Sequence, residues 1–144
     1  MTTPPRQHPH WVFADTSGYY AGASEDEQRH HEARAILVQL ERERVRFYTT
    51  LYVLAELHAL AITRRRNPRF ALDLLTQIEA SATTIVPVTA DDQAAARLLL
   101  AQRQDKLYSL TDALSFAVME RLGISRVFTF DRNFEQHGFQ LVTP

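Results

Sequence analysis

The sequence WVFADTSG at residues 11–18 decides how the fold of this chain is interpreted. Its first four residues form a continuous apolar run, which is typical of a short buried strand. The next four, at positions 15–18, have the side chains of turns and helix caps. We therefore predict a strand over residues 12–15, with Asp15 at its C-terminal end.

Similar apolar runs return along the chain and alternate with helical periodicity. Strands are expected at residues 12–15, 45–49, 84–88, 126–130 and 139–142, and helices at residues 27–44, 50–64, 70–80, 91–104 and 113–122. This alternation predicts an α/β fold, a three-layer α/β/α sandwich with a mostly parallel central sheet. Ligands of such sheets bind beyond the C-terminal ends of the strands, where Asp15 is expected.

The length and composition fit one cytoplasmic domain. We expect a single domain over residues 1–144, with a core at about residues 11–143 and a flexible, Pro-containing tail at residues 1–10. The chain has no cysteine and its tail has no apolar segment of a secretory signal. No run approaches the roughly 20 apolar residues of a membrane span, so no membrane partner is expected.

The charge of the chain gives little information about nucleic acid. A formal net charge of −1, from 16 Lys and Arg against 17 Asp and Glu, is not typical of a protein that grips long nucleic acid through many phosphates. A local arginine cluster could still contact a phosphate, so the distribution of charge matters more than its sum.

Four acidic residues stand where a globular domain normally has apolar side chains. Asp15 and Asp131 follow apolar runs, Asp112 stands at the start of a helix, and Glu56 interrupts the apolar stripe of another helix. An unpaired carboxylate in a low-dielectric interior is costly, so each should have a cation or a hydrogen-bond partner. We predict that the four acids form one buried metal site.

Carboxylates without a His or Cys companion favour Mg²⁺ or Mn²⁺ over zinc. Such a metal can orient a water for attack on phosphorus, so the predicted reaction is hydrolysis of phosphodiester bonds. We expect Asp15 and Asp112 to bind the metal directly and Asp131 to complete the site directly or through water. Glu56 is expected to bind metal or to position the nucleophilic water.

Each acid also has a local explanation. Asp15 could be a turn or N-cap residue, and Asp131 could form a turn. Asp112 could be an acid at the first position of a helix. Glu56 could pair with an arginine, because buried charges are usually paired or bind metals. That all four local explanations hold at once is improbable.

In their order and context, these residues resemble PIN-domain ribonucleases, and specifically the VapC-like toxins of type II toxin-antitoxin systems. The resemblance covers about residues 12–142 and rests on Asp15-Thr16-Ser17, Glu56-Leu57, Thr111-Asp112-Ala113-Leu114 with Ala117, and Thr129-Phe130-Asp131-Arg132-Asn133-Phe134. The chain departs from the family in its tail at residues 1–10, because such proteins often begin almost directly at the first strand.

The resemblance implies a Mg²⁺- or Mn²⁺-dependent endoribonuclease with the four acids as its catalytic and metal-binding residues. It also implies a homodimer, and inhibition by a cognate VapB-like antitoxin that inserts into the active-site groove.

Two further groups of polar residues are candidates for supporting roles. Thr16, Ser17 and Thr129 are expected to hydrogen-bond a carboxylate or a metal-bound water, with local capping as the alternative. Contacts to RNA phosphates or to the antitoxin are expected from arginines, with a solvated helix end or an exposed ion pair as the alternative. These arginines are Arg64, Arg65, Arg66, Arg69 and Arg132.

Two other functions remain open from the sequence. The chain could be a PIN-fold nuclease without an antitoxin, which processes RNA or DNA as a housekeeping enzyme. It could also be a noncatalytic module that keeps the fold and sequesters RNA or a protein.

Overall fold

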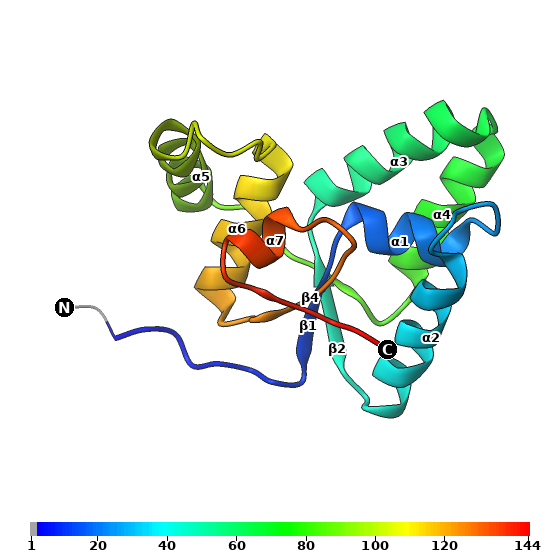
Figure 1. Cartoon of the computed structure of the whole chain (residues 1–144), viewed down its shortest axis with the longest axis horizontal. Coiled ribbons are helices and arrows are strands. Elements are labelled where there is room, and N and C mark those ends of the chain that lie inside the picture. Colours follow the sequence, from blue (N-terminus) through cyan, green and yellow to red (C-terminus); the bar gives the residue numbers. More distant parts are fainter. Residues whose placement is uncertain (1–2) are drawn as a thin grey trace.

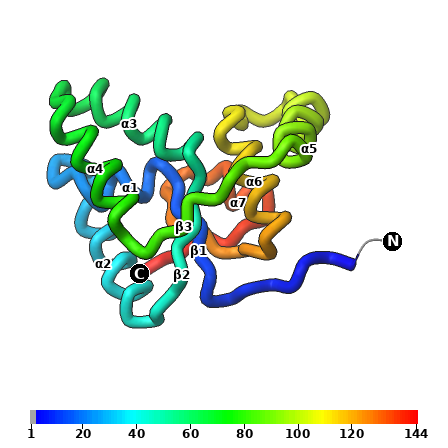
Figure 2. The backbone as a smooth tube through the Cα atoms, turned by 180° about the vertical axis from the view of Figure 1, so that it is seen from behind, coloured from blue at the N-terminus to red at the C-terminus, as the bar shows by residue number. Residues whose placement is uncertain are grey.

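A fully parallel sheet forms the centre of the structure, a computed structural model that describes residues 3–144. Its strand order is β3-β2-β1-β4-β5. The strands are β1 (Trp11–Ala14), β2 (Arg46–Thr49), β3 (Thr84–Ile85), β4 (Arg126–Phe128) and β5 (Gln140–Leu141). Figure 2 shows the sheet from behind, with the edge strand β3 and the chain that leads from it to the next helix.

Helices cover both faces of this sheet. Within residues 3–144 they are α1 (Thr16–Ala23), α2 (His30–Arg42), α3 (Leu51–Arg65), α4 (Pro68–Ala80), α5 (Ala90–Gln102), α6 (Leu110–Leu122) and α7 (Asn133–Gln136). In Figure 1, α1 to α4 stand on one side of the strands and α5 to α7 on the other. The predicted three-layer sandwich is confirmed, and the sheet is parallel throughout.

The side chains of β1 alternate between two cores, because successive residues of a strand point to opposite faces. Phe13 packs in the cluster that contains Phe116 of α6, whereas Val12 and Ala14 pack with Ile36 of α2. A third buried cluster joins α1, α3 and α4. The apolar run at residues 11–14 therefore holds both helical layers to the sheet.

Two helices that matter for the site begin at residues whose side chains cap them. The hydroxyl of Thr50 accepts the Val53 N–H at 3.3 Å and starts α3 directly after β2. Ser109 starts α6 with a capping box, in which its hydroxyl accepts the Asp112 N–H and the Asp112 carboxylate accepts the Ser109 N–H. Gly123 ends α6 in the left-handed region, with φ of 72°.

Several predicted boundaries were wrong. Residues 15–18 were expected to form a turn or a helix cap, and Asp15 is the N-cap of α1, but the helix at Thr16–Ala23 was not predicted. The four-residue helix α7 was not predicted, and α2 begins at His30 after a turn, not at residue 27. β3 is shorter than expected because Pro87 has no N–H to donate to a neighbouring strand.

The N-terminal segment contacts the body of the molecule. The N–H of His8 donates to the Gly123 carbonyl at 3.0 Å, and the His8 ring stacks on Trp11 with centroids 3.6 Å apart. Residues 1 and 2, which belong to the predicted flexible tail, lie outside the described residues, and the flexibility of the tail stays a prediction. None of the helices in residues 3–144 combines the length and apolar character that crossing a membrane requires.

Candidate active site

The four predicted acids lie at or near the ends of strands and the beginnings of helices. Asp15 directly follows β1, and Asp131 follows β4 after Thr129 and Phe130. Asp112 is the third residue of α6, and Glu56 lies in α3, which begins directly after β2. In a parallel sheet the C-terminal ends of the strands and the N-terminal ends of the following helices share one edge, so this topology gathers the acids there.

Electrostatic interactions show that the acids are close to one another. The negative charges of Asp112 and Glu56 both raise the pKa of Asp15, although less than burial does, and the charge of Asp112 raises the pKa of Asp131. Asp15 and Asp112 are buried, whereas Glu56 and Asp131 are half-buried. The fold therefore brings the four carboxylates into one neighbourhood that is only partly buried.

Asp15 occupies the most buried position of the four. Burial is the main cause that raises the pKa of its carboxyl from 3.8 to about 7, against the opposing effects of a hydrogen bond from the Thr129 side chain and of the nearby backbone N–H of Thr16. The Thr129 hydroxyl donates to Oδ2 at 2.9 Å, whereas Oδ1 is buried without a hydrogen-bond partner within residues 3–144. A buried oxygen of this kind is a favourable place for a cation or a water.

The predicted roles of Ser17 and Thr129 correspond to a chain of hydroxyls that ends on Asp15. Ser17 Oγ and Thr129 Oγ1 are 2.9 Å apart. Because the single proton of Thr129 is donated to Asp15, Ser17 must donate to Thr129. The backbone N–H groups of Phe130 and Asp131 donate to Ser17 Oγ at 2.9 Å and to Thr129 Oγ1 at 3.0 Å. α1 and the end of β4 thus orient the Asp15 carboxylate together.

Asn133 connects the other two aspartates. Its side-chain amide donates to Asp112 Oδ2 at 3.1 Å, an oxygen that also accepts the Ser109 N–H at 3.0 Å. Its backbone N–H donates to Asp131 Oδ1 at 2.9 Å. The pKa of Asp131 is nevertheless raised, because burial outweighs this hydrogen bond and the nearby charge of Asp112 acts in the same direction as burial.

The three aspartates share one pattern of hydrogen bonding. In each, one carboxylate oxygen accepts from the protein, and the other has no donor within residues 3–144. An anchored carboxylate with one remaining oxygen is suited to monodentate binding of a hard cation such as Mg²⁺ or Mn²⁺.

The local explanations apply only in part. Asp112 does have a capping role, at the third helical position and not the first, but the second oxygen of its carboxylate is left over. Within residues 3–144 Glu56 has no arginine partner. It lies at the border of the buried stripe of α3, since Val53 is buried and Tyr52 is 40% exposed.

The side chains do not form an assembled metal site. Within the described part of the chain, no group of three or more His, Cys, Asp or Glu side chains is arranged so that it could hold a metal ion. Carboxylates that are not neutralised repel one another, so they are expected to converge only around a cation. The donor chemistry of these acids therefore fits a hard metal, and we expect part of the acid set to move when the metal binds.

The predicted basic contacts are largely engaged within the chain. Arg64 pairs with Glu27 at 3.3 Å, Arg65 donates to Ser24 Oγ at 2.9 Å, and the exposed Arg132 pairs with Glu135 at 3.4 Å. A further pair joins Arg69 to Asp73, and Arg66 is the left-handed C-cap of α3. Exposed pairs of this kind are weak, so contacts to phosphate or antitoxin stay a prediction. Thr16 has a buried hydroxyl without a partner within residues 3–144, and its expected role also stays open.

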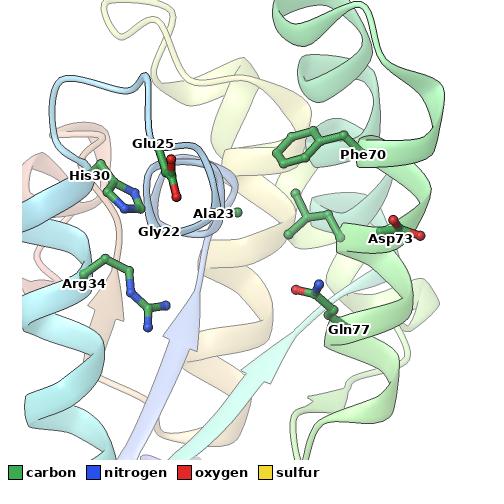
Figure 3. Close-up of a pocket in the computed structure, with 9 residues that line it drawn as sticks. Gly22, Ala23, Glu25, His30, Arg34, Phe70, Asp73 and Gln77 are labelled. Carbon is green, nitrogen blue, oxygen red and sulfur yellow. The ribbon is translucent and has the colours of Figure 1, made fainter.

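A cavity of about 490 Å³ opens elsewhere, between α1, α2 and α4. Figure 3 shows His30 and Arg34 of α2 on one side and Phe70, Asp73 and Gln77 of α4 on the other. The ring of His30 hydrogen-bonds to the Ala21 carbonyl at 2.8 Å through Nδ1. None of the four acids lines this cavity, so its size is no guide to the catalytic chemistry.

Sequence reasoning missed Ser109 and Asn133 as partners of the acids. The spacing Ser109-x-x-Asp112 is that of a capping box and could have indicated the first. The contact of Asn133 with Asp112 joins residues 21 positions apart, and no local pattern indicates it.

Comparisons with known proteins agree with this fold. The PIN domain family model matches residues 12–140. The 23S rRNA-specific endonuclease VapC20 of Mycobacterium tuberculosis, in strains CDC 1551 / Oshkosh and H37Rv, is 31% identical over 133 residues, which are 92% of this chain and 98% of VapC20. The crystal structure of M. tuberculosis VapC20, described as a toxin that cleaves the sarcin-ricin loop, superposes with a TM-score of 0.85 and covers 92% of this chain and 99% of that one.

The chain therefore belongs to the PIN domain family. Within this family it is VapC-like, and the resemblance noted from its sequence motifs is confirmed.

Proposed function

We propose that this chain, a VapC-like endoribonuclease, hydrolyses RNA with Asp15, Glu56, Asp112 and Asp131 as its catalytic carboxylates and with Mg²⁺ or Mn²⁺ as its cofactor. The observation that carries the proposal is the buried carboxylate of Asp15. Its Oδ1 has no hydrogen-bond partner within residues 3–144, and the negative charges of Asp112 and Glu56 raise its pKa. The similarity to a 23S rRNA-specific endonuclease supports RNA as the substrate.

The residues of the chain have distinct roles in this proposal. Asp15 and Asp112 would hold the ion through their remaining oxygens, Asp131 would complete the site, and Glu56 would bind the ion or orient the attacking water. When bound, a divalent metal supplies a nucleophilic water and neutralises charge on the phosphate. Rotation of Glu56 breaks no ion pair within residues 3–144, which allows it to turn toward the other acids. The hydroxyl of Thr129 keeps the Asp15 carboxylate oriented.

Cleavage of RNA by site variants tests the proposal. Asp15→Ala and Asp112→Ala should lower the rate of cleavage in Mg²⁺ by at least about 100-fold, because each removes a ligand of the ion. Asp91→Ala is the matched control, since Asp91 is an exposed acid in the first turn of α5 and should leave the rate unchanged. If Asp15→Ala and Asp112→Ala cleave RNA as fast as Asp91→Ala and the wild type, the catalytic assignment is wrong.

The same assay separates the alternative functions. Sequencing of the new RNA ends in total RNA tests whether 23S rRNA is cut, as the similarity to VapC20 suggests. Cleavage of DNA of the same sequence would favour a nuclease with a different role. Binding of RNA without cleavage would favour a noncatalytic module.

We further propose a cytoplasmic homodimer that is inhibited by a VapB-like antitoxin, with residues 11–143 as one PIN-like domain. The similarity to VapC20, described as a toxin, supports an antitoxin as a partner. Light scattering of the purified chain, alone and with the product of the adjacent gene, checks both partners.

A further inference from the structure

We infer that Asn133 is a positioning residue of the nuclease site, which holds Asp112 and Asp131 in the relative placement that cation binding needs. The inference rests on the proposed function and assigns a role to a residue outside the four acids and the hydroxyls beside them. The observation behind it is that Asn133 hydrogen-bonds two carboxylates, one at the start of α6 and one in the turn after β4.

Asn133 is the first residue of α7 and reaches two other segments of the chain. Its amide nitrogen Nδ2 donates to Asp112 Oδ2 at 3.1 Å and to the Leu107 carbonyl at 3.3 Å. Its backbone N–H donates to Asp131 Oδ1 at 2.9 Å. One residue thus fixes the start of α6, the loop before it and the turn after β4.

The orientation of the amide follows from its neighbours. Both groups at Nδ2 are oxygen acceptors, so a flipped amide would place Oδ1 of Asn133 against two other oxygens. Nδ2 must therefore face Asp112 and Leu107. This orientation gives Asp112 Oδ2 two donors, from Asn133 and from the Ser109 N–H, and leaves Oδ1 of Asp112 for the ion.

The two hydrogen bonds of Asn133 can be separated by substitution. A side-chain change removes the amide from Asp112 but keeps the backbone N–H that donates to Asp131. Asp112 then loses one of its two donors, and its carboxylate can rotate away from the orientation that binds the ion. Loss of a partner that orients a metal ligand typically weakens metal binding about 10- to 100-fold.

Titration of the full chain with MnCl2 in a calorimeter, without RNA, tests the inference. Asn133→Leu has a similar volume and no donor, and Asn133→Ala is a second variant in case the larger side chain disturbs folding. Both should bind Mn²⁺ at least about tenfold more weakly than the wild type. The Mg²⁺ concentration for half-maximal RNA cleavage should rise by a similar factor, with most of the rate recovered at saturating Mg²⁺.

Gln136→Ala is the matched control, because Gln136 is an exposed residue of the same helix and its side chain makes no hydrogen bond within residues 3–144. It should bind Mn²⁺ like the wild type. If both Asn133 variants bind like the wild type while Asp112→Ala does not, the inference is overturned and the proposed function stands. Circular dichroism that shows both variants unfolded also overturns it, because Asn133 then acts on the fold and not on the ion.

A wild type that neither binds Mn²⁺ nor cleaves RNA overturns the proposed function, and the inference with it. The wild type and Asp112→Ala therefore show whether the proposed function has failed or only the inference about Asn133.

Discussion

Asp15 is a residue at which stability and function oppose each other. The residue is 3% exposed, and burial raises the pKa of its carboxyl to about 7 from an ordinary value of 3.8. Its ionised form therefore costs free energy in the folded chain when no cation is present. The same lack of a partner at Oδ1 makes Asp15 a favourable ligand for a metal.

This conflict predicts a stabilising substitution that abolishes activity. Because the pKa of Asp15 is higher in the folded chain than in the unfolded one, the folded state holds more protons between about pH 4 and pH 7. The stability that protonated Asp15 contributes is thus fully present below the pKa that Asp15 has in the unfolded chain. It is lost as the pH rises through about 7, the pKa of Asp15 in the folded chain. Asp15→Asn removes the charge and keeps an oxygen that can accept from Thr129.

We expect Asp15→Asn to raise the free energy of unfolding at pH 8 by about 1–3 kcal/mol, to raise it much less at pH 5, and to abolish RNA cleavage. Urea unfolding in EDTA at the two pH values measures the difference. A gain of equal size at pH 5 and pH 8 would show that the charge of Asp15 is not its cause.

At the scale of elements, α1 is placed by the absence of a side chain at Gly18. A Cβ at this position would lie 2.5 Å from the Phe128 carbonyl oxygen and 2.9 Å from Phe128 Cδ2. The close approach of α1 to β4 lets Ser17 meet Thr129 at 2.9 Å. The orientation of Asp15 therefore depends on how tightly this helix packs on this strand.

We predict that Gly18→Ala destabilises the chain by about 1–3 kcal/mol, because the backbone of β4 must shift to accept the methyl group. RNA cleavage should fall as well, since Thr129 moves with β4. Gly22→Ala is the control, because its Cβ would meet only the flexible end of Leu37, at 3.1 Å, and alanine is favoured in a helix. Chemical denaturation and cleavage assays of both variants check this, and similar losses in the two would exclude a specific role of Gly18.

The same helix shows which elements the sequence can and cannot predict. β1 and the N-cap of α3 follow from local patterns, an apolar run and a threonine before a helical stretch. α1 was not predicted because Thr16, Ser17 and Gly18 favour turns locally, and packing against β4 overrides that preference. α7 was missed because a helix of four residues has no periodicity to detect.

At the scale of the molecule, the candidate site exists only in the folded chain. Its acids come from the ends of β1 and β4 and from α3 and α6, and the strand order that brings β1 between β2 and β4 is not encoded in any local pattern. The sequence could identify Asp15, Glu56, Asp112 and Asp131 as candidates for the site, because each stands among apolar residues. The connection of Asp112 to Asp131 through Asn133 could not, because it depends on the tertiary structure.

If the four acids bind a metal as proposed, this dispersed origin couples metal binding to the stability of the whole fold, because an unfolded chain has no such site. A ligand present at about 100 times its Kd stabilises the folded state by about 2.7 kcal/mol, which corresponds to a rise in Tm of roughly 5–10 °C for a chain of this size. We expect Mn²⁺ to produce such a rise at pH 8. At pH 6 the rise should be clearly smaller, because the pKa of Asp15 is about 7 and its carboxyl must lose a proton to bind the ion.

Thermal unfolding followed by circular dichroism, with and without Mn²⁺ at both pH values, measures this dependence. Asp112→Ala should show no rise at either pH, whereas Asp91→Ala should behave as the wild type because Asp91 is exposed and belongs to another helix. A rise of equal size at pH 6 and pH 8 would mean that the ion binds without Asp15, and the ligand set would then have to be sought among the other three carboxylates.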